Sequence, residues 1–258
     1  VRPPSPVFPP LVELAWYPCL GQIIRWAGAT SEGELVRRVT TLAVRFAGLA
    51  GRPAGSCVAM ARGLAQTVYC RIHDVRVVDR LERDARRRWE SFVAEAGVLP
   101  RAVFVSAHLG PFQLQMDLLA GLPQEKFFLY TSYRWPPLAE RVASLRMQAP
   151  RMRYIDIRKK RDIVEAMRTG GSPAILADAA PGRQGPADFP VRMACRYRLP
   201  MFIGGLFNPA ATPRNGLIRF GFDYYRVDPA DLETTTRAYA AAMDRTILNN
   251  PSDWIRFD

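Results

Sequence analysis

The sequence pattern changes at Pro100, and this change limits the fold more than any other feature of the chain. From that point on, short apolar or β-rich runs alternate with stretches of helical periodicity. The predicted strands are 102–108, 126–133, 153–157, 173–179, 200–207 and 217–227. The predicted helices are 111–122, 137–149, 160–171 and 231–250. This alternation predicts an α/β fold, with a mixed, mostly parallel sheet flanked by helices.

The first hundred residues predict a helical region instead. Ser31 is placed to cap a helix over 31–51, and further helical patterns cover 56–74 and 77–97. The apolar segment at 7–28 carries two Trp and one Tyr, which suit either a membrane interface or packing on the core. We expect residues 1–98 to form a helical region packed on an α/β core of residues 99–258, together one structural domain.

The charge balance favours a polyanionic partner. Lys and Arg total 36 against 24 Asp and Glu, a net charge of +12. Nucleic acid, an anionic membrane or an acidic carrier protein would each suit such a charge. The sequence has no glycine-rich phosphate loop, zinc-finger spacing or RNA-recognition motif, and its basic residues are dispersed. Nucleic acid is therefore the least favoured of the three.

The cysteines do not indicate a metal or a redox pair. Cys19, Cys57, Cys70 and Cys195 are widely spaced and form no C-x-x-C motif, which predicts free thiols in a reducing compartment. Cys70 and His73 have the spacing of two metal ligands, but the sequence offers no second pair to complete a site. A run of about 20 apolar residues is also absent, so the sequence predicts no membrane span.

His108, one of two histidines, follows a predicted strand and precedes a predicted helix. In parallel sheets, ligands bind beyond the carboxyl ends of the strands, which is where this residue falls. Gly110 permits close backbone approach, and Pro111 suits the first helical position. The helix start also presents free N–H groups. His108 is a candidate general base; the alternatives are a metal ligand or a histidine hydrogen-bonded within the core.

The stretch from His108 to Gln113, His-Leu-Gly-Pro-Phe-Gln, resembles a block of the bacterial lipid A biosynthesis (lauroyl/myristoyl) acyltransferase family. There the block typically reads His-Phe-Gly-Asn-Trp-Glu, and the wider glycerolipid acyltransferase superfamily has a histidine followed after four residues by Asp or Glu. Three later blocks, at 129–142, 163–182 and 249–258, are similar to further family blocks in the same order. The resemblance covers most of residues 31–258.

The resemblance implies an acyltransferase that moves an acyl group from acyl-carrier protein or acyl-CoA to a hydroxyl or amine. His108 would be the general base, and N–H groups near Gly110 would stabilise the oxyanion. Arg134 and Asp178 carry over from the second and third blocks. Phosphate would be held by Arg134 and by the arginines after Asp178, namely Arg183, Arg192, Arg196 and Arg198. No bound cofactor or metal is implied, and the protein would be cytoplasmic, peripheral on the inner face of the cell membrane.

Gln113 departs from the family, which has an acid at this position. A glutamine carbonyl can accept the ring N–H of His108 and orient it, but it cannot balance the charge of an imidazolium. In the serine-protease template, the corresponding change from Asp to Asn costs about 10⁴ in rate. Asp117 lies four residues further along the same helix face and could reach His108 through Gln113, a water or a shifted helix, or Asp178 could approach from a neighbouring strand. Otherwise Gln113 marks a catalytically silent relative that binds lipid or carrier protein.

Overall fold

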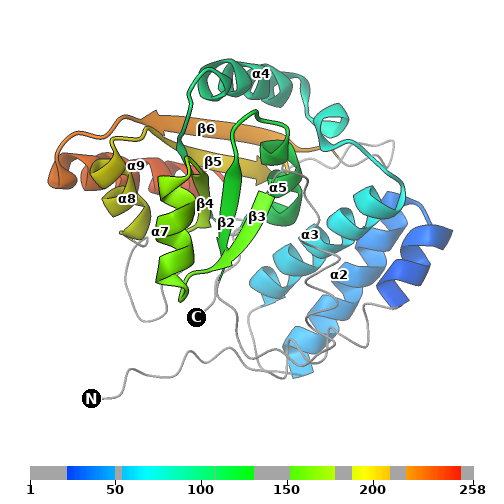
Figure 1. Cartoon of the computed structure of the whole chain (residues 1–258). Coiled ribbons are helices and arrows are strands. Elements are labelled where there is room, and N and C mark those ends of the chain that lie inside the picture. The colour runs from blue at the N-terminus through cyan, green and yellow to red at the C-terminus, as the bar shows by residue number, and fades with distance from the viewer. Residues whose placement is uncertain are drawn as a thin grey trace.

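The computed structural model of the chain describes residues 22–49, 54–107, 109–130, 152–177, 188–209 and 219–250. Figure 1 shows how the helices and strands are arranged. In chain order they are α2 (Glu32–Leu49), α3 (Ala54–Ile72), the 3-10 helix η1 (Val77–Arg80), α4 (Arg83–Gly97), β1 (Val103–Ser106), α5 (Phe112–Ala120), β2 (Lys126–Tyr130), β3 (Met152–Asp156), α7 (Lys160–Arg168), β4 (Ser172–Leu176), α8 (Phe189–Tyr197), β5 (Met201–Phe207), β6 (Gly221–Val227) and α9 (Leu232–Leu248).

The described strands form one six-stranded sheet in the order β3-β2-β4-β1-β5-β6. All neighbouring strands are parallel except β5 and β6, which are antiparallel. The predicted α/β fold with a mixed, mostly parallel sheet is therefore confirmed. β1 lies inside the sheet between β4 and β5, so the turn that follows it starts from the middle of the carboxyl edge.

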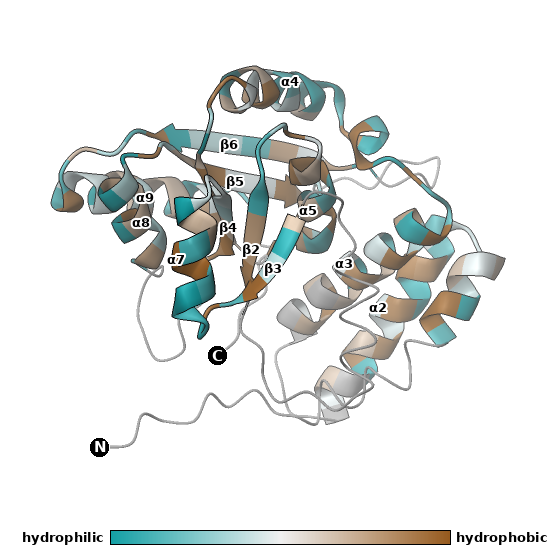
Figure 2. Ribbon diagram, in the orientation of Figure 1, coloured by the Kyte–Doolittle hydropathy of each residue, from teal (hydrophilic) through white to brown (hydrophobic). Residues whose placement is uncertain are grey.

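Helices cover both faces of the sheet. Phe104 of β1 packs with α4 and α5, whereas its neighbours Val103 and Val105 pack with α7, α8 and α9. Covered faces explain why the strands are continuous apolar runs rather than alternating ones. In Figure 2 the hydrophobic colour accordingly fills much of β2, β4 and β5, whereas α7 presents a hydrophilic outer surface.

α2 and α3 form a separate helical layer beside α5 (Figure 1). Their contact is built from small and aliphatic residues, including Leu35 and Val39 of α2 and Ala61 and Leu64 of α3. Ile23 and Ala27, from a helical segment at 22–29, join the same cluster. α4 also precedes residue 98, but it packs on the sheet through Trp89 and Phe92. The helical region therefore has two parts with different packing partners.

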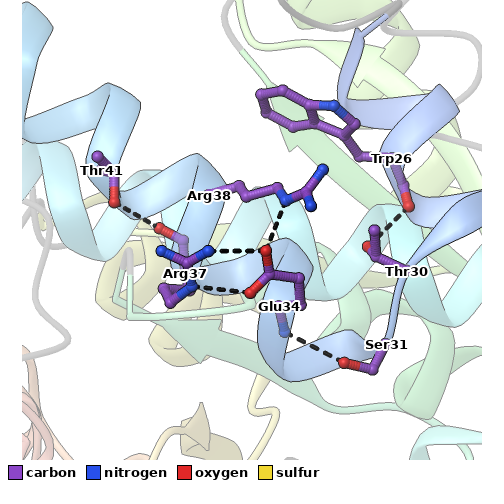
Figure 3. Close-up of polar contacts among 7 residues, drawn as sticks. All are labelled: Trp26, Thr30, Ser31, Glu34, Arg37, Arg38 and Thr41. Atoms are coloured by element: carbon purple, nitrogen blue, oxygen red, sulfur yellow. Dashed lines mark hydrogen bonds and ion pairs between the residues drawn. The ribbon is translucent and has the colours of Figure 1, made fainter.

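The start of α2 is fixed locally, as Figure 3 shows. Ser31 Oγ accepts a hydrogen bond from the backbone N–H of Glu34 at 3.4 Å, as expected of a cap. The Glu34 carboxylate accepts hydrogen bonds of 2.7 Å from Arg37 and from Arg38, and these bonds lower the pKa of Glu34 to about 2. Arg37 is exposed, and Glu34 and Arg38 are only half-buried, so solvent screens the network and it orients side chains rather than supplying much stability.

The predicted single helix at 77–97 is wrong. The structure divides it into η1 and α4, with Leu81 and Glu82 between them in extended conformation. Leu81 forms a bridge with Phe220, whose N–H donates to Arg80 O at 2.8 Å and whose carbonyl accepts from Glu82 N–H at 2.9 Å. Leu81 is buried, so this tertiary contact overrides the helical periodicity.

Helix α8 was not predicted from the sequence. Pro190 lies in its first turn, where the missing N–H costs nothing, and Val191 and Ala194 are buried against the α9 side of the sheet. Arg198 ends the helix with φ +52°. The predicted helix at 137–149 lies outside the described residues.

Candidate functional site at the turn after β1

The turn between β1 and α5 is tight and buried. Ala107 and Leu109 are both almost fully buried, and Leu109 N–H donates to Ala107 O at 2.8 Å. Gly110 has φ +39°, a conformation that favours glycine. Pro111 is the N-cap, one position earlier than predicted, and α5 begins at Phe112. His108 itself lies outside the described residues.

The carboxyl ends of β1, β4 and β2 lie side by side along one edge of the sheet, and the predicted site residues follow these three strands in the sequence. Ser106 of β1 is paired with Leu176 of β4, and Ala177 N–H donates to Ser106 O at 2.9 Å. β2 pairs with the opposite side of β4, so its carboxyl end is the next one along the edge. His108 follows β1 in sequence, Arg134 follows β2, and Asp178 and Arg183 follow β4. Arg134, Asp178 and Arg183 also lie outside the described residues.

Gln113 is the second residue of α5, and its carbonyl oxygen is, with those of Gln66 and Gln124, one of the buried amide oxygens that accept no hydrogen bond within the described residues. The side chain is half-buried, Oε1 is shielded from solvent, and within the described ranges it accepts no hydrogen bond. A buried acceptor without a donor costs about 1–3 kcal/mol, so proteins rarely keep one without a use. This oxygen is suited to accept an N–H, either from a neighbouring ring or from a ligand.

Asp117 shares the α5 face of Gln113, as the spacing predicted, because both residues lie within the helix. Its carboxylate forms an ion pair with Arg71 of α3, 3.4 Å from Oδ1 to Nη2. Burial raises the pKa of Asp117, and the nearby Arg71 charge partly opposes that rise. The ion pair is a structural role that the sequence did not reveal. A relay from Asp117 through Gln113 stays a prediction.

Helix α3 lies directly on the turn. A β-carbon built at Gly63 would lie 2.2 Å from the carbonyl oxygen of Gly110, so the contact is possible only without a side chain. One turn further along α3, Gln66 Nε2 donates to Asn208 Oδ1 at 2.5 Å, just after β5 ends. Sequence reasoning missed this arrangement. A glycine within an otherwise helical apolar run was the available signal, because such a glycine usually has a packing reason.

Arg62 adds a cation to this part of α3. It is half-buried and lies one turn before Gln66 on the same helix face. Burial lowers the pKa of Arg62, although a guanidinium stays charged at neutral pH. A partly desolvated arginine near the carboxyl ends of the strands is suited to bind phosphate or carboxylate.

A second polar contact fixes the opposite face of α5 to the sheet. Ser106 Oγ donates to Gln115 Oε1 at 2.9 Å, and Gln115 Nε2 donates to Gly204 O at 3.1 Å. A β-carbon at Gly205 would lie 2.2 Å from Gln115 Oε1, so β5 needs glycine at that position. α5 is thus held to β1 and β5 on one side and to α3 on the other.

The later arginines do not all belong to this edge. Arg192, on the first turns of α8, is exposed and paired with Asp188 at 2.9 Å. Arg196 and Arg198 directly precede the start of β5, which is at the amino edge of the sheet. The structure therefore does not bring Arg196 and Arg198 to the turn after β1.

The second histidine has a structural role. His73 Nε2 lies 2.8 Å from Ala27 O, and its ring packs against Tyr69. Cys70 is buried, and burial raises the pKa of its thiol to about 12. A thiol held neutral in this way is a poor nucleophile and a poor metal ligand.

The sequence matches no known protein-family model, and no curated protein matches it significantly. The resemblance to the lipid A acyltransferases therefore stays a prediction that rests on the quoted residues. Among the helices that the structure describes, none is both long and apolar enough to cross a membrane.

Proposed function

We propose that the chain is an acyltransferase that moves an acyl group from acyl-carrier protein or acyl-CoA to a hydroxyl or amine, with His108 as general base. The observation that carries the proposal is the buried Gln113 Oε1, which accepts no hydrogen bond from the described residues. It lies at the start of α5, five residues after a histidine that follows an interior strand. In the proposed mechanism the second ring nitrogen of His108 needs an acceptor, and this oxygen would supply it.

In the proposed reaction, one ring nitrogen of His108 removes the proton from the acceptor hydroxyl or amine as it attacks the thioester carbonyl carbon. The other ring nitrogen keeps its proton and donates it in a hydrogen bond to Gln113 Oε1. The resulting oxyanion is stabilised by backbone N–H groups at the start of α5, close to Gly110. When the intermediate collapses, the carbon–sulfur bond breaks and the imidazolium returns its proton to the leaving thiolate.

Glutamine makes this mechanism slower than a carboxylate would. It fixes the tautomer and orientation of the ring but leaves the imidazolium charge unbalanced. A well-placed general base supplies about 10²–10⁴ in rate, so losing the balancing charge can remove much of that gain. Asp117 does not replace it directly, because its carboxylate is already paired with Arg71.

The net charge of +12 supports an acidic donor protein or an anionic membrane that presents the acceptor. We place the protein in the cytoplasm, peripheral on the inner face of the cell membrane. The second candidate function is a catalytically silent relative that binds lipid or carrier protein, and Gln113 in place of an acid favours it.

The test is thiol release from a panel of acyl-CoA and acyl-carrier-protein donors, with a lipid extract as acceptor. Three chains are compared: the unaltered protein, His108→Ala and Gln113→Glu. We expect slow release that His108→Ala abolishes and that Gln113→Glu accelerates by about 10²–10⁴, the range attributed to a balanced general base.

His73→Gln is the matched control for the first variant, because it changes the other histidine while keeping a hydrogen-bonding side chain near Ala27 O. Gln22→Glu is the control for Gln113→Glu, because it makes the same change on an exposed part of the helical region, beside Arg25. Release that survives His108→Ala would contradict the mechanism. Silence of all three chains would favour the binding protein.

A further inference from the structure

Helices α2 and α3 and the segment at 22–29, together called the helical layer here, have an apolar core of their own. Among the described residues, the buried members of this core all lie between positions 23 and 65. The buried members of the two clusters on the faces of the sheet all lie from Cys70 onwards. The layer therefore keeps its own apolar core whether or not it is docked on the sheet.

The face of α3 that meets the α/β core is small and polar. Gly63, Thr67 and Arg71 follow one another at intervals of four residues, so they share one side of the helix. Gly63 lies against the carbonyl of Gly110, and Arg71 pairs with Asp117. Thr67, between them, is 2% exposed. Water can replace hydrogen bonds and ion pairs when two surfaces separate, whereas it does not replace apolar packing.

Docking of the layer removes two of its polar groups from water. Gln66 is fully buried; its Nε2 donates to Asn208 Oδ1, and its Oε1 accepts no hydrogen bond within the described ranges. The side chain of Glu32, at the start of α2, is 2% exposed, and its carboxylate lies 3.5 Å from Arg80 of η1. Both burials cost free energy that hydration would return. The docked and separated arrangements are therefore brought closer in free energy.

The linker at 73–76 joins the layer to η1 and has the features of a hinge. Asp74 has φ +49°, in the left-handed region that residues other than glycine rarely adopt. His73 Nε2 lies 2.8 Å from Ala27 O, so the first linker residue is tied to the layer. Cys70 packs in the cluster of the sheet and anchors this end of α3. A few residues at the end of an element are typical of a hinge.

The docked layer covers the turn that carries the candidate site. Gly110 and Pro111 are both buried. A β-carbon at Gly63 would lie 2.2 Å from the carbonyl oxygen of Gly110 and 3.3 Å from Cα of Pro111, so α3 rests directly on this turn. A ligand that approaches from this side meets α3 first. Access to the start of α5 from this side therefore requires α3 to move.

We propose that the helical layer is a hinged cover, which swings as a unit about the linker at 73–76 and uncovers the turn after β1. The swing separates Gly63 from the turn and Gln66 from Asn208, while the apolar core inside the layer stays intact. Opening hydrates the polar groups that docking buries, and it gives a ligand access to the start of α5. The proposal does not rest on the proposed function, because the opening needs no substrate.

The test measures how fast buried thiols of the full, folded chain react with iodoacetamide, with mass spectrometry to assign each site. Thr67→Cys places a reporter between the layer and the core. Ser172→Cys is the matched control, because it makes the same exchange of hydroxyl for thiol at a fully buried position of β4. Each rate is divided by the rate of the same thiol in the urea-unfolded chain.

We expect the Thr67→Cys thiol to react at least about tenfold faster than the Ser172→Cys thiol, because a local opening requires less free energy than global unfolding. Native Cys57, which is 7% exposed within the core of the layer, should react as slowly as the Ser172→Cys thiol. This difference between two positions of α3 distinguishes movement of the layer from unfolding of the helix.

Arg71→Ala, added to Thr67→Cys, should speed the reaction about tenfold, because docking then buries the Asp117 carboxylate without its partner. Arg86→Ala is the matched control. Arg86 pairs with Asp79 at 3.8 Å, and both residues lie outside the layer, so the rate should stay the same.

Equal rates for the Thr67→Cys and Ser172→Cys thiols would overturn the cover, because the layer would then separate only on global unfolding. Reaction of Cys57 as fast as that of the Thr67→Cys thiol would overturn it too, as would equal acceleration by Arg71→Ala and Arg86→Ala. Circular dichroism checks folding, and Gln66→Cys replaces Thr67→Cys if that variant is unfolded. Opening without turnover of acyl donors would remove the proposed function and leave the cover; turnover without opening would do the reverse.

Discussion

Helices α3 and α4 both belong to the predicted helical region, yet they join the core in opposite ways. α4 inserts large rings: the Phe92 ring centroid lies 5.3 Å from Phe202 and 5.5 Å from Phe222. α3 meets the core through a glycine and through polar pairs, such as Gly63 against Gly110 and Arg71 with Asp117. One interface is apolar and continuous with the sheet; the other is small, polar and next to the candidate site.

This difference separates two tasks. Burial of aromatic rings is non-directional and strong, so α4 stabilises the sheet without fixing the position of any one group. Close backbone contact and ion pairs are directional, and they tolerate little displacement. The contact of α3 therefore sets where the turn after β1 lies, and less of the stability depends on it. Substitutions in the two interfaces should consequently affect different measurements.

The largest expected effect is on stability, from Phe92→Ala in α4. Removing this ring opens a cavity among the rings around it, and such changes cost about 3–5 kcal/mol. We expect the free energy of unfolding in urea to fall by that amount. Val93→Ala is the control, because Val93 is 36% exposed on the same helix and should cost less than about 1 kcal/mol. A loss below about 1 kcal/mol for Phe92→Ala would mean that α4 is dispensable to the sheet.

The next effect should separate stability from function. Gly63→Ala places a β-carbon 2.2 Å from the Gly110 carbonyl oxygen, so α3 or the turn must shift. We expect a loss of about 1–3 kcal/mol in the free energy of unfolding, typical of overpacking. If the proposed function holds, thiol release should fall by more than this loss of stability explains, because the turn carries the base.

Gly55→Ala provides the control on the same helix. Its β-carbon would meet nothing within 4 Å, and Gly55 lies in the first turn of α3, so the change should alter the free energy of unfolding by less than about 1 kcal/mol and leave thiol release as it was. Equal behaviour of the two alanine variants would show that the contact between Gly63 and the turn has no effect, and the assigned role of α3 would be wrong.

The fold was largely predictable because its determinants are local. Apolar runs separated by helical stretches depend on sequence periodicity, and they predicted the strands and most described helices. The failures occurred where distant residues decide. Leu81 leaves a helical pattern to pair with Phe220, and α8 forms in a segment for which the sequence predicted no helix. Nothing in the sequence around Leu81 or around Phe220 indicates that these two residues pair.

Only those features of the candidate site that depend on residues close together in the sequence could be predicted. Three features follow from neighbouring residues: the strand-to-helix junction at His108, the glycine turn, and the shared helix face of Gln113 and Asp117. The contribution of α3 could not be predicted, because Arg71 lies 46 residues before its partner Asp117. A single sequence shows that a charged residue lies on a helix, but it does not show which distant helix supplies the opposite charge.

The smallest expected effect is that of Arg71→Ala, and pH should identify its origin. Without Arg71, the partly buried Asp117 carboxylate loses its compensating charge, and the pKa of Asp117, already raised by burial, rises further. A carboxyl whose pKa is higher in the folded than in the unfolded state makes the fold more stable when it is protonated than when it is ionised. Stability is therefore lost as pH rises from the ordinary Asp pKa through the raised one. We expect Arg71→Ala to lower the free energy of unfolding by about 1–2 kcal/mol at neutral pH relative to the unaltered protein, a figure reduced for the partial exposure of the pair. This deficit should shrink as the pH falls towards about 4.

Urea unfolding at both pH values measures this deficit, and the Asp117→Asn background supplies the control. In that background the ion pair with Asp117 is absent, so the part of the Arg71→Ala effect that depends on the ionisation of Asp117 should disappear. A deficit that does not change with pH in the native background would show that Arg71 acts through the packing of its stem rather than its charge. The polar description of the α3 interface would then be restricted to Gly63 and Gln66, whose contacts carry no titratable group.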